Sequence, residues 1–189
     1  MIRRFETRDL DEVMSLWLHA NIESHSFIEA DYWKKNYDMV RKLIPEAEVF
    51  VAEENEKIQG FIGLTDTYIA GIFVKAKEQS KGIGTELLRT VMKLKDQLNL
   101  NVYKKNMRAV VFYQHRGFKI VNQKIDENTS EEEYTMEWHR QAGGKNEDST
   151  CLCVCTSWKY KETGGENCRK MWRHTDRCHE ATGGGSFGI

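Results

Sequence analysis

Apolar residues recur at helical spacing in four segments of the chain, which predicts four helices. Thr7 or Asp9 can cap the first helix, because Asp9 begins a sequence that resembles a capping box. Asp31 can cap the second helix, Pro45 ends it, and residues 22–30 between the two helices are irregular. The third helix is expected to begin at the glycines 82 and 84, and the fourth to lie between Asn106 and Gly117.

Alternating or continuous apolar runs predict the strands. Residues 53–57 are polar and predict the turn of a hairpin, whereas residues 68–74 are apolar on both faces, as is typical of a central strand. The expected strands cover residues 2–6, 48–52, 58–64, 68–74, 99–103, 118–123 and 134–138. The order β-α-α-β-β-β-α-β-α-β-β predicts an α/β (α+β) domain built on one sheet.

Composition divides the chain near residue 140. All five cysteines follow residue 150, and eight of the 14 glycines follow residue 140. We therefore expect residues 1–140 to form a cysteine-free globular domain and residues 141–189 to be a disordered Cys- and Gly-rich extension. The group Cys151, Cys153, Cys155, Cys168, Cys178 and His179 leaves zinc binding open, although the spacing is poor for it, and we expect no metal.

The charges nearly cancel, with 28 basic and 29 acidic residues, so the strong basic footprint of a nucleic-acid-binding protein is absent. No apolar run approaches the roughly 18 residues of a membrane span, and the N-terminus lacks the apolar region of a secretory signal. These features predict a cytoplasmic protein that binds neither nucleic acid nor a membrane.

The most informative segment is the polar loop that follows residues 68–74 and leads into Gly82-Ile83-Gly84. A helix N-terminus offers backbone N–H groups and a partial positive charge to a phosphate, and glycine allows a close approach. Lys81 adds a mobile positive charge. The segment lacks the third glycine of a dinucleotide fingerprint and the Gly-Lys-Ser/Thr of a P-loop.

A second motif, Asn106-Met107-Arg108-Ala109-Val110-Val111-Phe112-Tyr113-Gln114-His115-Arg116-Gly117-Phe118, follows by one helix and one strand. Together the two segments resemble the GCN5-related N-acetyltransferase (GNAT) superfamily, whose motifs read Gln/Arg-x-x-Gly-x-Gly/Ala and Asn-x-x-Ala-x-x-Phe-Tyr-x-x-x-Gly-Phe. The resemblance covers residues 1–139. Ser24 to Ile28, Tyr32-Trp33 and Pro45 further resemble the small bacterial acetyltransferases of the YiaC/YjaB type.

The resemblance implies a mixed, mostly antiparallel sheet flanked by helices, and acetyl-CoA as co-substrate. It implies that Phe73 and Val74 run beside the pantetheine arm and that Asn106 contacts the arm, although Asn106 also fits a simple helix cap. The pyrophosphate loop comprises Gln79, Ser80, Lys81, Gly82, Ile83, Gly84 and Thr85.

Tyr113 is the expected general acid, because a phenol with a pKa near 10 keeps its proton at neutral pH and can protonate the departing thiolate. A base is also needed, since an amine like that of lysine is almost fully protonated at pH 7. His25 titrates in the right range, and Glu23, Glu29 and His115 remain alternatives.

The expected reaction moves an acetyl group to a primary amine, for which a protein lysine is the first candidate. A small amine of the aminoglycoside or polyamine type, or a non-catalytic acetyl-CoA-binding module, remain alternatives, because acceptor pockets depend on variable loops. The aromatic residues Trp17, Tyr32, Trp33, Tyr37 and Tyr68 can line an acceptor groove or belong to the core, and the acidic stretch 127–133 can attract a cation. The protein is expected to be a monomer or homodimer.

Overall fold

The computed structural model describes residues 1–141, and the predicted extension and its cysteines lie outside the described residues. The described part has the predicted order of helices and strands. The strands are β1 (Ile2–Arg4), β2 (Glu48–Glu54), β3 (Lys57–Thr65), β4 (Tyr68–Val74), β5 (Gln97–Tyr103), β6 (Lys119–Ile125) and β7 (Glu132–His139), and the α-helices are α1 (Leu10–Ser24), α2 (Ala30–Leu43), α3 (Ile83–Leu94) and α4 (Met107–Gln114).

The strands form one seven-stranded sheet in the order β1-β2-β3-β4-β5-β7-β6. Every neighbouring pair is antiparallel except β4 and β5, which are parallel. The predicted mixed, mostly antiparallel sheet is therefore confirmed, and β4 lies at its centre as its two apolar faces indicated.

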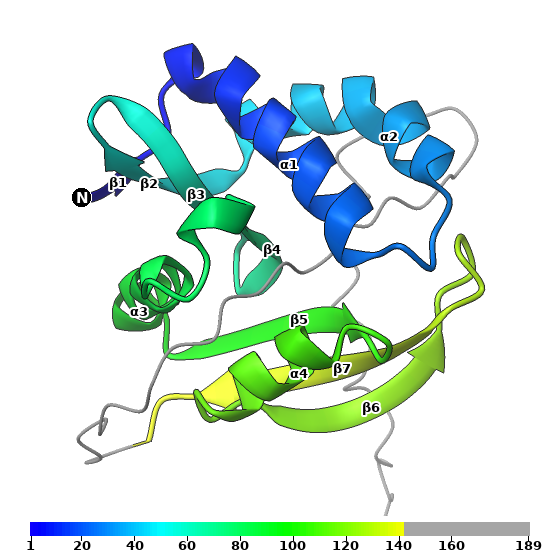
Figure 1. The fold of residues 1–189 in the computed structure, drawn as a ribbon. Coiled ribbons are helices and arrows are strands. Elements are labelled where there is room, and N and C mark those ends of the chain that lie inside the picture. Colours follow the sequence, from blue (N-terminus) through cyan, green and yellow to red (C-terminus); the bar gives the residue numbers. More distant parts are fainter. Residues whose placement is uncertain (142–189) are drawn as a thin grey trace, which may run out of the picture.

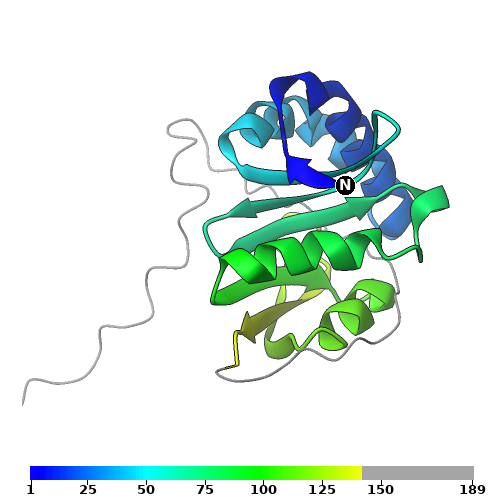
Figure 2. The ribbon, with the colours of Figure 1, turned by 90° about the vertical axis from the view of Figure 1, so that its left-hand side faces the viewer.

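Two apolar cores lie on opposite faces of this sheet. Helices α1 and α2 pack on one face, where Trp17 and Trp33 are fully buried. Helices α3 and α4 pack on the other face through residues such as Leu88 and Phe112 (Figure 1). Figure 2 shows this layering from the side, with the blue N-terminal helices and the green helix α3 on opposite sides of the strands. All five aromatic groove candidates contact or belong to the first core: Trp17, Tyr32, Trp33, Tyr37 and Tyr68.

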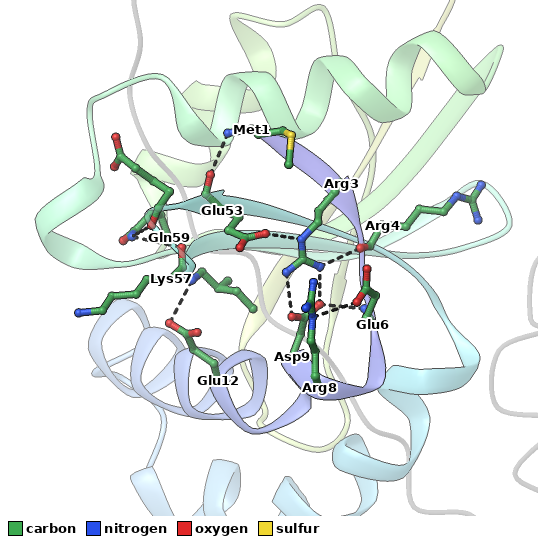
Figure 3. A network of polar contacts seen from close by, with 12 residues as sticks. Met1, Arg3, Arg4, Glu6, Arg8, Asp9, Glu12, Glu53, Lys57 and Gln59 are labelled. Carbon is green, nitrogen blue, oxygen red and sulfur yellow. Dashed lines mark hydrogen bonds and ion pairs between the residues drawn. The ribbon is translucent and has the colours of Figure 1, made fainter.

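The start of α1 differs from the prediction. Asp9 directly precedes the helix, but its carboxylate makes no cap hydrogen bond to α1. It accepts instead from the backbone N–H of Glu6 at 2.8 Å and from two nitrogens of Arg3, at 2.7 and 2.9 Å. Arg3 also contacts Glu53 on β2 (Figure 3). The Arg3 pair therefore replaces the helix cap, because a buried carboxylate gains more from a bidentate cation than from one N–H group.

Helix boundaries differ by a few residues at the connection between α1 and α2. Helix α1 continues to Ser24 within the segment that was expected to be irregular, and α2 begins at Ala30 after Glu29, so Asp31 lies in its first turn rather than at its cap. The second helix ends at Leu43, just before the 3-10 turn that contains Pro45, as predicted.

No helix within residues 1–141 is long and apolar enough to cross a membrane. The same residues bring together no group of three His, Cys, Asp or Glu side chains that could hold a metal ion.

Candidate active site

The loop before α3 turns sharply at its end. Gly82 has φ 93°, in the left-handed region that glycine tolerates best, and Ser80 also has a positive φ of 65°. The N-cap residue Gly82 has no side chain, so no side chain caps the first N–H groups of α3. A helix of 12 residues thus points its N-terminus at this loop, which is the arrangement that binds phosphate.

The predicted loop residues divide between this N-terminus and the loop's own contacts. Ile83, Gly84 and Thr85 form the first turn of α3. The Gln79 side chain turns back to donate to the Val74 carbonyl at 3.2 Å. The Lys81 ammonium, exposed, pairs with Glu78 at 2.9 Å. The groups that we expect to bind phosphate are therefore the backbone N–H groups of the loop and the exposed Lys81 ammonium.

Strand β4 is irregular where it approaches β5. The register with β3 shifts between the pairs Gly63–Gly71 and Leu64–Ile69, so Ala70 forms a bulge. Within residues 1–141, a single register pair, Tyr68 with Asn99, joins β4 to β5. The parallel ladder therefore ends near the start of β4, and the rest of β4, with Phe73 and Val74, leads toward the α3 loop.

Close packing fixes β3 and β4 beside the loop. A Cβ atom at Gly60 would lie 2.7 Å from the Phe73 carbonyl oxygen and 3.2 Å from Cγ2 of Ile83. Only glycine at this position lets β3 come so close to β4 and to the start of α3.

Tyr113 lies in the last turn of α4 and is fully buried. Its ring makes edge contacts with Phe112 and Phe118, with centroids 5.2 Å away in both cases. The same core contains Leu87 and Leu88 of α3. Tyr113 therefore lies on the side of the sheet that also carries the α3 N-terminus, so the structure brings the predicted acid and the predicted phosphate loop to one face.

Asn106 caps α4 as predicted. Its Oδ1 accepts from the backbone N–H of Ala109 at 3.2 Å, and its Nδ2 lies 3.2 Å from Nε2 of His25. His25 lies at the C-terminus of α1 and is fully buried, with Nδ1 3.1 Å from the Asn21 carbonyl. Rings surround it at 5.4–5.7 Å: Phe27, Trp33 and Tyr103. The three other base candidates, Glu23, Glu29 and His115, are exposed.

A buried polar cluster organises the turn between β6 and β7. The Asp126 carboxylate accepts from the hydroxyls of Tyr103 and Thr129, both at 2.8 Å. Burial, with a contribution from Asp126, raises the pKa of Tyr103 well above its usual value, so Tyr103 remains the donor. Burial also raises the pKa of Tyr68 to about 12, an effect that Asp126 increases and the backbone N–H of Asn101 opposes.

Lysines pair with much of the neighbouring acidic stretch. Glu131 pairs with Lys105 at 2.8 Å, and Glu132 pairs with Lys104 at 3.0 Å. Glu133 is buried, with Oε1 3.6 Å from the Lys124 ammonium. These pairs offset part of the charge with which the stretch can attract a cationic acceptor.

The chain matches proteins of one family. The profile described as an acetyltransferase (GNAT) domain matches residues 45–120. The chain is 34% identical over 140 residues to the peptidyl-lysine N-acetyltransferase YiaC of Escherichia coli. This match covers 73% of this chain and 96% of YiaC. The chain belongs to the GNAT family.

Solved GNAT structures share its fold. The apo form of YjaB from Escherichia coli has a TM-score of 0.66 and 25% identity, and covers 75% of this chain and 98% of that protein. The PaiA N-acetyltransferase of Thermoplasma acidophilum, solved with coenzyme A, has a TM-score of 0.63 at 19% identity, over 74% of this chain and 98% of that protein. Together with the sequence matches, they identify the chain as an N-acetyltransferase of GNAT type.

Arg116 lies beside the α3 loop, although the specified positions of the GNAT motifs do not include it. Arg116, just after α4, donates to the Thr85 hydroxyl at 2.7 Å and to the Phe112 carbonyl at 3.1 Å, and its guanidinium stacks 4.0 Å from the Phe112 ring centre. It thereby links the end of the Tyr113 helix to the first turn of α3. The contact between Arg116 and Phe112 can be expected from their four-residue spacing. The contact with Thr85 spans 31 positions, and no sequence pattern indicates it.

Proposed function

We propose that this protein transfers the acetyl group of acetyl-CoA to the side-chain amine of a protein lysine. The observation that carries the proposal is the juxtaposition, on one face of the sheet, of the α3 N-terminus without a side-chain cap and the buried Tyr113 on α4. GNAT enzymes take their acetyl group from acetyl-CoA, which supplies it as a reactive thioester.

The main chain around α3 suits the phosphates of that co-substrate. No side chain caps the N-terminus of α3, and we expect the backbone N–H groups at residues 80–85 to bind the pyrophosphate there. Lys81, whose side chain is exposed, can exchange its Glu78 partner for a phosphate, because an ion pair near the surface contributes little. The backbone at Phe73 and Val74 would lie along the pantetheine arm, and donors there would polarise the thioester carbonyl.

Tyr113 would supply the proton that the thiolate needs when the amine displaces it. A phenol holds its proton at neutral pH, and the edge contacts with Phe112 and Phe118 fix the ring. The attacking amine must lose one proton as well, and the sequence offers His25, Glu23, Glu29 and His115 as candidate bases.

The acceptor assignment rests on the relatives. YiaC and YjaB, at 34% and 30% identity, are named peptidyl-lysine N-acetyltransferases. The likeness to YiaC runs over 96% of its length, so it extends beyond the acetyl-CoA motifs and supports the same class of acceptor.

An acetylation assay tests the proposal. Purified protein and acetyl-CoA are combined with a panel of lysine peptides, with the same peptides carrying arginine for lysine, and with aminoglycosides and polyamines, and thiol release and product mass are measured. We expect transfer to lysine peptides alone. Transfer confined to small amines would replace the lysine assignment, and acetyl-CoA binding without any transfer would indicate a binding module.

A further inference from the structure

His25 and Asn106 form a buried contact between parts of the chain that are 81 positions apart. The Asn21 carbonyl oxygen can only accept a hydrogen bond, so Nδ1 of His25 must be the donor. The hydrogen of a neutral imidazole therefore lies on Nδ1. Nε2 then carries the lone pair and accepts from Nδ2 of Asn106. A proton on Nε2 would place two donors face to face.

The contact also fixes the orientation of the Asn106 amide. With Nδ2 directed at His25, Oδ1 accepts from the Ala109 N–H and caps α4. A reversed amide would lose both hydrogen bonds. The bond to His25 therefore sets the directions in which the nitrogen and the oxygen of the Asn106 amide point.

We propose that His25 is a positioning residue, which orients Asn106 for acetyl-CoA and holds the start of α4 for Tyr113. The inference rests on the proposed function and assigns His25 a role through another side chain. Tyr113 follows Asn106 by seven residues, which is about two helical turns, so the two lie along the same side of α4. His25 belongs to the α1–α2 connection, so this bond ties that loop to the helix of the proposed acid.

Three substitutions separate positioning from base catalysis. His25→Phe keeps a ring among Phe27, Trp33 and Tyr103 but removes the acceptor. His25→Gln restores an acceptor oxygen toward Asn106 but takes up no proton near neutral pH. Asn106→Ser keeps a side-chain oxygen for the α4 cap but removes the amide donor. His19→Gln is the control, since His19 lies on the exposed side of the same helix.

Calorimetry and kinetics give the first readout. We expect the acetyl-CoA dissociation constant to rise about tenfold in His25→Phe and in Asn106→Ser, the cost of one lost hydrogen bond. The double variant should be no weaker than either single variant, because both remove the same bond. In His25→Gln, affinity and kcat should return to within about threefold of the original values, with the pH profile of kcat/KM unchanged.

Base behaviour would overturn the proposal. His25→Gln would then be as inactive as His25→Phe, the acid limb of the pH profile would disappear, and acetyl-CoA affinity would stay unchanged in both. Unchanged affinity and kcat in His25→Phe would also refute it.

Imidazole ¹⁵N NMR of the original protein gives a readout independent of catalysis and of any variant's folding. It should show the Nδ1–H tautomer of His25 at pH 7, and the Nε2–H tautomer would refute the proposal. A protein that transfers no acetyl group to any peptide would refute the proposed function, whereas the tautomer and the affinities would still decide the role of His25.

Discussion

The Tyr113 hydroxyl is the atom on which the proposed proton transfer depends. Tyr113→Phe keeps the ring contacts with Phe112 and Phe118 and removes only the donor. We expect kcat to fall about 100-fold or more while the acetyl-CoA dissociation constant barely changes, since general acid catalysis contributes at that scale. Stopped-flow thiol release measures the first quantity and calorimetry the second. An unchanged kcat would assign the proton to water.

Asp9 makes stability depend on pH through its pairing with Arg3. The Arg3 hydrogen bonds lower the pKa of Asp9 below its usual value, against the opposing effect of burial. A depressed carboxylate pKa stabilises the fold above its unfolded value near 4, and the contribution is lost as the pH falls through the folded value. Asp9→Asn should cost about 1–3 kcal/mol at pH 7.

Urea unfolding of the original protein and Asp9→Asn from pH 7 to pH 3 checks this. The difference in the free energy of unfolding between the two proteins should be constant down to about pH 4 and shrink below it. Asp11→Asn is the control, because the Asp11 carboxylate is exposed and pairs with Arg41 at the surface, where such pairs contribute little. A gap for Asp9→Asn that persists unchanged at pH 3 would show that the side chain stabilises through packing alone.

The α3 N-terminus can be tested as an element through Gly82. Gly82→Glu places a side chain at φ 93° and a negative charge at a proposed phosphate site. We expect the KM for acetyl-CoA to rise by about tenfold or more, through strain, clash and repulsion. Gly117→Ala is a matched control, since Gly117 has a similar φ of 85° but follows α4 rather than the loop. It should lower the melting temperature and leave this KM unchanged, and an equal KM effect in both variants would refute the site.

Local patterns predicted the elements because their causes are local. The apolar run 68–74 has the bounds of β4. The Asn106 cap is also local, because its side-chain oxygen accepts from the N–H of Ala109, only three residues later. The Asp9 cap was wrong because Arg3 competes for the carboxylate, which a helix signal does not record. The bulge at Ala70 was not predicted, because the apolar pattern of one strand does not show how that strand pairs with its neighbour.

Contacts between distant segments determine much of the site, and sequence periodicity carries no information about them. The motifs gave the α3 loop and Tyr113, since each is a property of one helix. The burial of His25 against Asn106 spans 81 positions, and the Arg116–Thr85 contact spans 31. Such pairs depend on how the helices pack on the sheet. From the sequence, His25 could therefore be given a role only from the chemistry of its imidazole.

At the level of the whole chain, we propose that residues 1–140 form the acetyltransferase domain. Arg140 completes it, because its NH2 group lies 3.0–3.2 Å from the carbonyls of Met92, Lys93 and Lys95 at the end of α3, where cations stabilise helices. A protein truncated after Arg140 should therefore melt within about 2 °C of the full chain and keep its transfer rate. Arg140→Ala in the truncated protein should lower the melting temperature by about 3–6 °C. A large loss on truncation alone, or one tightly held zinc per full-length chain by mass spectrometry, would instead couple the cysteines after residue 150 to folding.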